Sequence, residues 1–319
     1  TKTGAGTMVL SGFGTGTGVT NVNGGTLQYA MPGALYGGTT ANWTAANINV
    51  ASGATLAVNV GGASDFSTAN VTTLLTQLST VNNNGLKAGA SIGFDTTNAT
   101  ATVSYSSALT NSTGTGGGNI GFKKLGTGTL SLSGTNTYVG PTTVLGGTLQ
   151  FTKPGALYNG VTGNWAPANI IVNSGTTLAL NVGGATDFTT GNATTLLSQI
   201  SAVASNGLKA GATVAFDTTN AAGTVAYASP IADSIGAGGG AIHFTKLGTG
   251  TLSLDGVSTY SGATTASAGT LALGSGGSIN NSSGVSIASG ATYNVSAVAG
   301  YNLAQTLSAK GTGTANVTG

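Results

Sequence analysis

Apolar and polar residues alternate along short segments of the chain, and Gly, Ser and Asn separate one segment from the next. Residues 129–132 read Thr-Leu-Ser-Leu, and residues 148–151 read Thr-Leu-Gln-Phe. A period of two is typical of a strand with one buried face, but a strand this short buries too little apolar surface to be stable alone. The pattern therefore predicts short strands that stack on one another as the rungs of a solenoid.

These strands lie in a segment that occurs three times. Its copies begin at Lys2, Lys124 and Lys246, so that both steps are 122 residues long, with no insertion or deletion. The second copy reads KLGTGTLSLSGTNTYVGPTTVLGGTLQ, and the third reads KLGTGTLSLDGVSTYSGATTASAGTL. An internal period of this length indicates an array of similar structural units.

The period divides the chain into three predicted solenoid repeats, at residues 1–122, 123–244 and 245–319. The third repeat is shorter and reaches a new Lys-Gly-Thr-Gly-Thr at Lys310. The leucines of the motif are expected to form the core, because they occupy alternate positions of the strands. They are Leu130, Leu132, Leu149, Leu252, Leu254 and Leu271.

The hydrophobic period changes to that of a helix in one segment of each of the first two repeats. The apolar residues there are Val71, Leu74, Leu75, Leu78 and Val81, and then Ala193, Leu196, Leu197, Ile200 and Val203. We predict one short amphipathic helix over about 67–82 and another over about 189–204. Thr189 or Thr190 is available as the N-cap of the second helix, and Gly207 as its stop. Such a helix needs an apolar surface, for which the flank of the solenoid is the nearest candidate.

Two apolar strands, Ile170 to Val172 and Thr177 to Val182, are separated only by a corner of Asn, Ser, Gly and Thr. A corner of this kind suits either a hairpin or the bend between two faces of one coil. The bend agrees with the stacking inferred from the short strands. We therefore expect these two strands to lie on different faces of the solenoid.

Charged residues are scarce in this chain. There are eight Lys, six Asp, no Arg and no Glu among 319 residues, so the net charge is +2. A nucleic-acid partner needs several cationic side chains along one face, and this chain does not supply them. Because Cys is absent, disulfides and thiolate metal sites are excluded, and no apolar run is long enough for a membrane helix.

The residues that carry chemistry are few and scattered. His243 is the single histidine, and its place between Ile242 and Phe244 predicts an outward strand residue. Four aspartates recur with the repeat, Asp65 with Asp187 and Asp95 with Asp217. They are interpreted as caps or Asx turns, because the alternative, calcium, takes six to eight oxygen ligands. We predict no catalytic residue, no metal and no cofactor.

Trp43 and Trp165 occupy equivalent positions in the first two repeats. Each follows an Asn and precedes a predicted strand. One interpretation is that each indole covers an end of the apolar core. The alternative is that each stacks on a sugar and so contacts a ligand.

The motif resembles the autotransporter-associated β-strand repeat of passenger regions in large Gram-negative surface proteins. The resemblance rests on the Gly-Thr-Leu strand, Asn-x-Tyr-x-Gly, paired Thr and Gly-Gly-Thr-Leu strand in residues 124–150. Segments such as NSGTTLAL from residue 173 and NLAQTLSAKGTGTANVTG from residue 302 resemble the strands that usually follow. The first copy departs from the pattern, with Thr3 at the position of Leu125 and no aromatic counterpart of Tyr138.

The resemblance implies a right-handed parallel β-helix, exported by the type V route to the surface of a Gram-negative-type bacterium. It implies no catalytic residues, because the motif is a packing motif. We therefore expect an all-β solenoid that serves as an extracellular stalk, fibre or surface coat, with copies of itself as partners through end-to-end stacking of coils. The alternative is an adhesin whose repeated loops or helical inserts hold glycan or a host surface.

Overall fold

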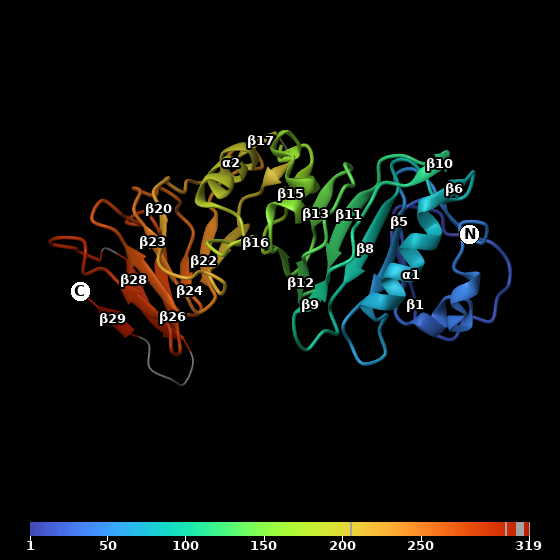
Figure 1. Cartoon of the computed structure of the whole chain (residues 1–319), viewed down its shortest axis with the longest axis horizontal. Helices are drawn as coiled ribbons and strands as arrows, with labels where there is room; N and C mark the ends of the chain where they lie inside the picture. Colours follow the sequence, from blue (N-terminus) through green and yellow to red (C-terminus); the bar gives the residue numbers. More distant parts are fainter. Residues whose placement is uncertain (205, 304, 311–315, 319) are drawn as a thin grey trace. The chain divides into compact units, whose positions relative to one another are not determined.

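The computed structural model describes residues 1–204, 206–303, 305–310 and 316–318 (Figure 1). The chain forms two compact units. Unit 1 comprises Thr1–Leu149 and Gly155–Asn164, and unit 2 comprises Gln150–Pro154 and Trp165–Gly319. The division into three repeats rests on the period of the sequence. That these repeats are the domains of the chain stays a prediction. Most of the new motif copy predicted after Lys310 lies outside the described residues.

Unit 1 is built from short strands. They are β1 (Thr7–Leu10), β2 (Thr20–Val22), β3 (Thr26–Tyr29), β4 (Ile48–Val50), β5 (Thr55–Asn59), β6 (Thr80–Asn82), β7 (Gly85–Leu86), β8 (Ser91–Asp95), β9 (Val103–Tyr105), β10 (Thr113–Thr115), β11 (Gly121–Leu125), β12 (Thr129–Leu132) and β13 (Thr142–Val144). A further strand, β14 (Thr148–Phe151), belongs partly to each unit.

The strands of unit 1 pair in parallel. One sheet follows the order β1-β3-β5-β8-β11-β13, a second the order β2-β4-β7, and the pairs β10-β6 and β12-β9 complete the unit. Sequence neighbours such as β2 and β3 lie in different sheets, and each pairs with a strand one coil further on. This is the winding of a parallel β-helix, in which backbone hydrogen bonds run between coils.

Unit 2 repeats the scheme. Its strands are β15 (Ile170–Val172), β16 (Thr177–Asn181), β17 (Ala202–Ala204), β18 (Gly207–Leu208), β19 (Thr213–Asp217), β20 (Val225–Tyr227), β21 (Ile235–Ala237), β22 (His243–Leu247), β23 (Thr251–Leu254), β24 (Thr264–Ala266), β25 (Thr270–Leu273), β26 (Gly284–Ala288), β27 (Thr292–Asn294), β28 (Thr306–Lys310) and β29 (Asn316–Thr318).

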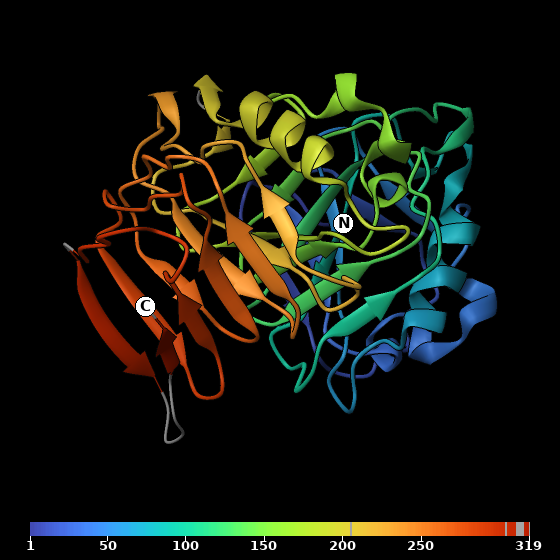
Figure 2. The same ribbon diagram turned by 60° about the vertical axis from the view of Figure 1, so that its left-hand side comes forward.

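From β22 onward, successive strands of unit 2 alternate between two sheets. One sheet contains β16-β19-β22-β24-β26-β28, and the other contains β20-β23-β25-β27-β29, all paired in parallel. Figure 2 shows the later strands of these sheets, orange to red, side by side. The pairs β17-β21 and β15-β18 belong to the same unit. The corner between β15 and β16 is therefore a bend between two sheets, as predicted.

Each unit contains one α-helix in the described residues. They are α1 (Thr68–Ser79) and α2 (Thr190–Ile200). Ser67 and Thr189 are the N-caps, and each accepts the amide of the Asn three residues on, whose side chain in turn accepts the amide of the cap residue. Short 3-10 turns occur at Pro32–Ala34, Tyr36–Gly38, Thr40–Asn42, Pro154–Ala156, Tyr158–Gly160 and Thr162–Asn164.

Both helices end earlier than the apolar spacing predicts. The segment after α1 forms β6 and pairs with β10, and the segment after α2 forms β17 and pairs with β21. Val81 and Val203, the last apolar residues assigned to the helices, are therefore strand residues. Pairing with a distant strand overrides the local helical pattern here.

The core of each unit contains an aromatic cluster at equivalent positions. In unit 1 the ring of Phe94 packs edge-on against Tyr105 and Phe122, with centroids 5.2 Å apart in both pairs. In unit 2 Phe216 packs in the same way against Tyr227 at 5.1 Å and Phe244 at 5.4 Å. Edge-to-face packing of this kind stabilises the core beyond the contribution of the buried apolar area.

Candidate functional site

The predicted core leucines lie at the strand positions that face inward. Leu130, Leu132, Leu149, Leu252, Leu254 and Leu271 are all at most 1% exposed. Across β23 and β25 the leucines stand in register, with Leu252 beside Leu271. Such ladders bury apolar side chains from successive coils against one another, at roughly 1.5–3 kcal/mol for each side chain.

The lysine that opens each motif copy is buried. Lys124 is 0% exposed, and its Nζ donates to the carbonyls of Leu125 at 2.7 Å, Gly126 at 2.8 Å and Gly146 at 3.1 Å. Lys246 makes the same three kinds of bond, as does Lys2 in the first copy. Three acceptors match the three N–H donors of an ammonium group.

The charge state of this lysine is set by two opposing influences. Burial lowers the pKa of Lys124 to about 8, and the nearby Asp95 carboxylate acts in the opposite direction. Burial likewise lowers the pKa of Lys246 to about 8, opposed by Asp217. Both side chains are therefore mainly ammonium ions at neutral pH, able to donate to all three carbonyls.

The three carbonyls that surround each motif lysine are called the lysine cage below. A glycine of the motif allows one coil to approach the next closely enough to form it. Gly147 has a φ of +57°, a left-handed conformation that L side chains rarely adopt. A Cβ added there would collide with the backbone carbonyls of Thr127 and Gly128 in the coil below. The Gly-Gly pair of the motif is thus a backbone requirement of stacking.

Asp95 and Asp217 each belong to a row of hydrogen-bonded polar side chains on neighbouring strands. Gln28 Nε2 donates to Asn59 Oδ1 at 2.6 Å and to Asp95 Oδ2 at 2.8 Å. Asp95 Oδ1 accepts the amide of Thr97 at 2.9 Å, which is the predicted Asx turn. In unit 2 Gln150, Asn181, Asp217 and Thr219 repeat these contacts. The carboxylate is therefore occupied by protein donors in both units.

A family model for the passenger-associated transport repeat matches residues 1–28, 122–151 and 244–273. The chain carries three passenger-associated transport repeats. These matches confirm the resemblance to autotransporter passenger repeats and cover the lysine cage, the core leucines and the Gly-Gly pair described above. The family implies an extracellular or surface-exposed passenger segment of a Gram-negative bacterium. No curated protein and no solved structure matches the chain significantly.

The two tryptophans lie between the passenger-associated transport repeats and are fully buried. Trp43 and Trp165 are each 0% exposed. Trp43 Nε1 donates to the carbonyl of Leu35 at 3.0 Å, and its ring packs against Phe66 with centroids 5.5 Å apart. Trp165 packs in the same way against Phe188, at 5.9 Å. Neither indole has a surface in this conformation on which a sugar could stack.

The remaining candidates are engaged with the backbone. His243 Nδ1 accepts the amide of Ala263 at 2.8 Å, so its place on β22 is structural. Asp65 accepts the amide of Gly62 at 2.9 Å, and Asp187 that of Gly184 at 3.1 Å. They close turns before the helices rather than capping them. Within the described residues, no three His, Cys, Asp or Glu side chains are grouped to hold a metal ion.

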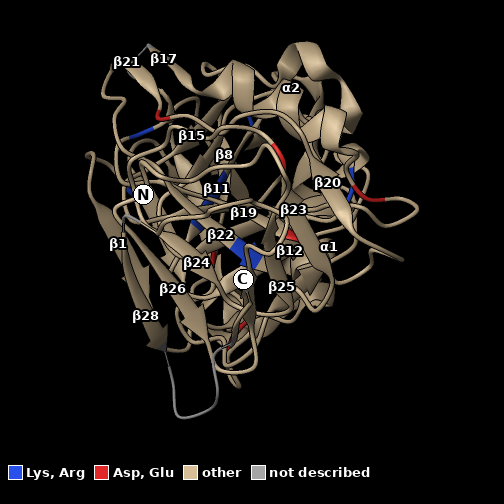
Figure 3. Cartoon of the chain, turned by 90° about the vertical axis from the view of Figure 1, so that its left-hand side faces the viewer, with Lys and Arg blue, Asp and Glu red and all other residues tan. Residues whose placement is uncertain are grey.

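Two features of the site were missed in the sequence. The lysine cage had a visible signal, because Lys opens all three motif copies in a chain with so little charge. Figure 3 shows how sparse the charged residues are. The second feature is a pocket beside each helix, for which the sequence held no signal beyond the helix itself. No helix in the described residues is long and apolar enough to cross a membrane.

Proposed function

We propose that this chain is a structural passenger segment, whose parallel coils build an extracellular stalk, fibre or surface coat. The observation that carries the proposal is the motif itself: its leucines, lysine and glycines all serve the stacking of one coil on the next. Strands joined by backbone hydrogen bonds and apolar ladders need little surface charge to hold together, which agrees with a charged content of 4%.

We further propose that coils of separate copies stack end to end. In the sheets described, β1 is an outermost strand and pairs only with β3. On β1 the exposed fraction is 46% for Met8 and 53% for Val9. The strands β28 and β29 lie at other sheet edges, where Leu307 and Val317 are exposed. An open edge with apolar side chains favours the addition of another strand. Any further coil offers such a strand, and the proposal is that a second copy of this chain supplies it.

Electron microscopy at rising protein concentration tests this function. We expect filaments that lengthen with concentration. The variant Val9→Lys places a charge on the edge strand and is expected to shorten or abolish them. Val161→Lys is the matched control, since Val161 is 51% exposed and lies outside the strands. Particles of one fixed length at all concentrations would contradict end-to-end stacking.

Adhesion through the helical inserts is the second candidate function. Two repeats contain a helix with an exposed side, and the strands of their coils pair with one another without using that helix. The presence of these helices therefore favours a role other than stacking. The variants Thr76→Glu and Ser198→Glu change exposed positions of α1 and α2 and leave the coils intact. Loss of binding to glycan-coated or cell surfaces in these variants, with filaments unchanged, would assign adhesion to the inserts. A non-enzymatic role is part of both proposals.

A further inference from the structure

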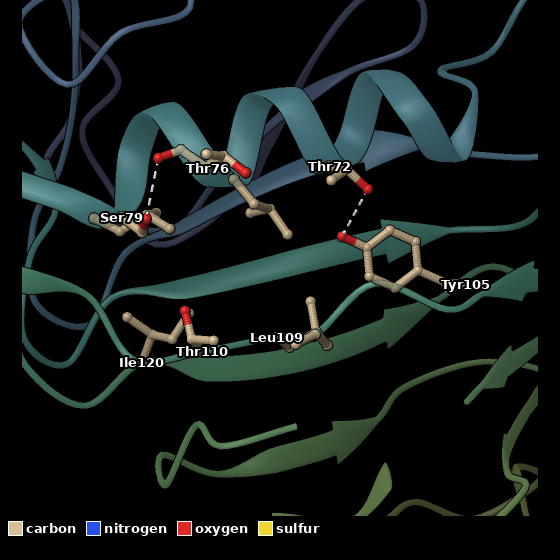
Figure 4. A pocket seen from close by; sticks show the side chains of 10 residues that line it. Thr72, Thr76, Ser79, Tyr105, Leu109, Thr110 and Ile120 are labelled. Atoms are coloured by element: carbon tan, nitrogen blue, oxygen red, sulfur yellow. Dashed lines mark hydrogen bonds between the residues drawn. The ribbon is translucent and has the colours of Figure 1, made fainter. Parts of the chain in front are cut away.

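A pocket lies between α1 and the flank of unit 1 (Figure 4). Its apolar wall is formed by Leu75, Leu86, Leu109 and Ile120. Leu86, Leu109 and Ile120 are almost fully buried, while Leu75 is half-buried on the helix. Thr72 and Tyr105 close one end with hydroxyl groups, and the mouth is rimmed by further hydroxyl-bearing residues of the helix.

The same pocket occurs in unit 2. Its apolar wall is formed by Leu197, Leu208, Ile231 and Ile242, and its polar end by Thr194 and Tyr227. Each of these residues stands one repeat length, 122 residues, after its counterpart in unit 1. The two pockets therefore arise from the same insert packing on the same part of the coil.

The two pockets differ in size for a visible reason. The cavity volume is about 160 Å³ in unit 1 and about 310 Å³ in unit 2. Thr76 and Thr110 line the first pocket, and the smaller Ser198 and Ala232 stand at the equivalent positions of the second. These two exchanges leave more room, although Pro230 of the second pocket is larger than its counterpart Ala108 in the first. The second pocket therefore accepts the larger ligands.

The polar end has the same geometry in both units. In unit 1 Thr72 Oγ1 lies 2.9 Å from Ser107 Oγ and 3.3 Å from Tyr105 Oη. In unit 2 the distances from Thr194 Oγ1 are again 2.9 Å and 3.3 Å. Burial raises the pKa of both Tyr105 and Tyr227, so each keeps its proton at neutral pH. The lone pairs of the tyrosine oxygen are available to accept one more hydrogen bond.

Among the residues that the structure describes, no charged side chain lines either pocket. A charged ligand would lose its hydration on entering without gaining a counter-ion, which costs several kcal/mol. A fully apolar ligand would leave the hydroxyl end without a new partner. The lining therefore matches a neutral molecule that is apolar over most of its surface and carries one hydrogen-bond donor.

We propose that each pocket binds a small neutral aromatic alcohol of the phenol class, with its ring against the leucine and isoleucine wall and its hydroxyl toward Tyr105 or Tyr227. A cavity of about 150 Å³ lined by apolar side chains is large enough for benzene in an engineered protein. The smaller pocket thus accommodates one six-membered ring, and the larger one a substituted ring. This binding goes beyond a structural role, because the coils stack without it.

The first test is binding of phenol to the full chain, measured by calorimetry with ligand-observed NMR. We expect saturable binding at two sites in each chain, and no saturation by benzoate, its charged counterpart. The variants Tyr105→Phe and Tyr227→Phe together remove the hydrogen bond. They should weaken phenol binding about 3- to 10-fold and leave toluene binding unchanged, as expected for a neutral hydrogen bond.

The second test fills the pockets from their exposed rims. Thr76→Trp should remove the site of unit 1 and halve the number of phenol molecules bound, and Thr76→Trp with Ser198→Trp should remove both. Ala69→Trp is the matched control, because Ala69 is exposed on the same helix and lies outside the pocket. Thermal unfolding by circular dichroism verifies that each variant folds. The proposal is overturned if phenol fails to saturate, or if it binds the doubly filled variant as it binds the unmodified chain.

Discussion

The ammonium group of Lys124 donates a hydrogen bond to the carbonyl of Gly146, 3.1 Å away and 22 residues later in the chain. It thereby joins the beginning of one motif copy to the Gly-Gly corner that precedes the last strand of that copy. Lys2 makes the corresponding bond to Gly24 at 3.0 Å, and Lys246 to Ala268 at 3.1 Å. The lysine thus acts as a fixed link between successive coils.

Replacing this lysine by an apolar residue of similar length should destabilise the fold strongly. In Lys124→Met three part-buried carbonyls lose the bond to the ammonium group at once, although that of Leu125 keeps the amide of Thr96 at 3.1 Å. Each loss of a bond to a charged group costs about 1.5–3 kcal/mol before relaxation. We expect a loss of about 3 kcal/mol or more in the free energy of unfolding, measured by urea titration. Lys153→Met, at a partly exposed position, is the control and should change it by less than about 0.5 kcal/mol.

Stability should depend on alkaline pH in two opposing steps, of which the first comes from the lysines. Because their pKa is about 8 in the folded chain and 10.5 when unfolded, the unfolded chain holds more protons between these values. The free energy of unfolding therefore rises with pH in this window. Thermal unfolding from pH 7 to 10 should show an increasing midpoint, and Lys124→Met with Lys246→Met should lose the increase. A midpoint that does not rise over this range would mean that the carbonyls retain the proton against the effect of burial, so that the folded pKa is not lowered.

The second step comes from buried tyrosines. Burial raises the pKa of Tyr158 from 10.0 to about 12, and it raises that of Tyr138 well above its ordinary value. Their contribution to stability is complete below pH 10 and is lost as the pH rises through the folded pKa. The unfolding midpoint should therefore fall above pH 10. Ultraviolet titration at 295 nm should show that some tyrosines ionise only when the chain unfolds.

The Gly-Gly corner gives a prediction on backbone conformation. Gly147→Ala introduces a Cβ at a φ of +57° and against the carbonyls of the coil below, so both strain and collision act. We expect a loss of at least about 2 kcal/mol in the free energy of unfolding. Gly223→Ala is the control, because that position has ordinary φ and no atom near the added Cβ. Equal effects at the two positions would show that close coil contact is not the reason for the motif glycine.

Much of this fold follows from local pattern. Period-two strands, a repeat of constant length and the family resemblance together predict parallel stacking, and the buried rows of Leu252 and Leu271 lie where alternation places them. The Asx turn at Asp95 follows from its side-chain chemistry. Thr189, one of the two residues predicted as the cap of the second helix, is its N-cap. The reciprocal bonds that the Asn three residues after each cap completes were not predicted.

Other features depend on contacts that a single sequence does not display. The helix ends were misplaced because Val81 and Val203 pair with strands more than 30 residues away. The lysine cage needs the Gly146 carbonyl of another coil, which no local pattern places. The pockets arise from a small mismatch between a helix and the coil beneath it, and neither partner alone reveals it.

A buried Asn of the motif should contribute more to the free energy of unfolding than its counterpart in the next repeat. Asn136 is 0% exposed, accepts the amide of Leu109 at 2.8 Å and donates to the carbonyl of Ala156 at 2.6 Å. The equivalent Ser258 accepts only the amide of Ile231 among the side-chain bonds described, at 3.1 Å. Asn136→Ala should therefore cost about 2–3 kcal/mol in unfolding free energy, against about 1 kcal/mol for Ser258→Ala. The order of the two urea midpoints checks this, and the reverse order would contradict it.

The buried position of Trp43 separates packing from ligand contact. In Trp43→Phe the hydrogen bond to the Leu35 carbonyl is lost and a cavity forms beside Phe66, so the free energy of unfolding should fall by about 2–4 kcal/mol. Binding to glycan arrays and to cells should stay unchanged in the folded variant, because the indole has no exposed surface. A stable variant that loses glycan binding would instead show that the loop opens and that the indole stacks on a sugar. Measuring the urea midpoint and glycan binding on the same preparation distinguishes the two roles.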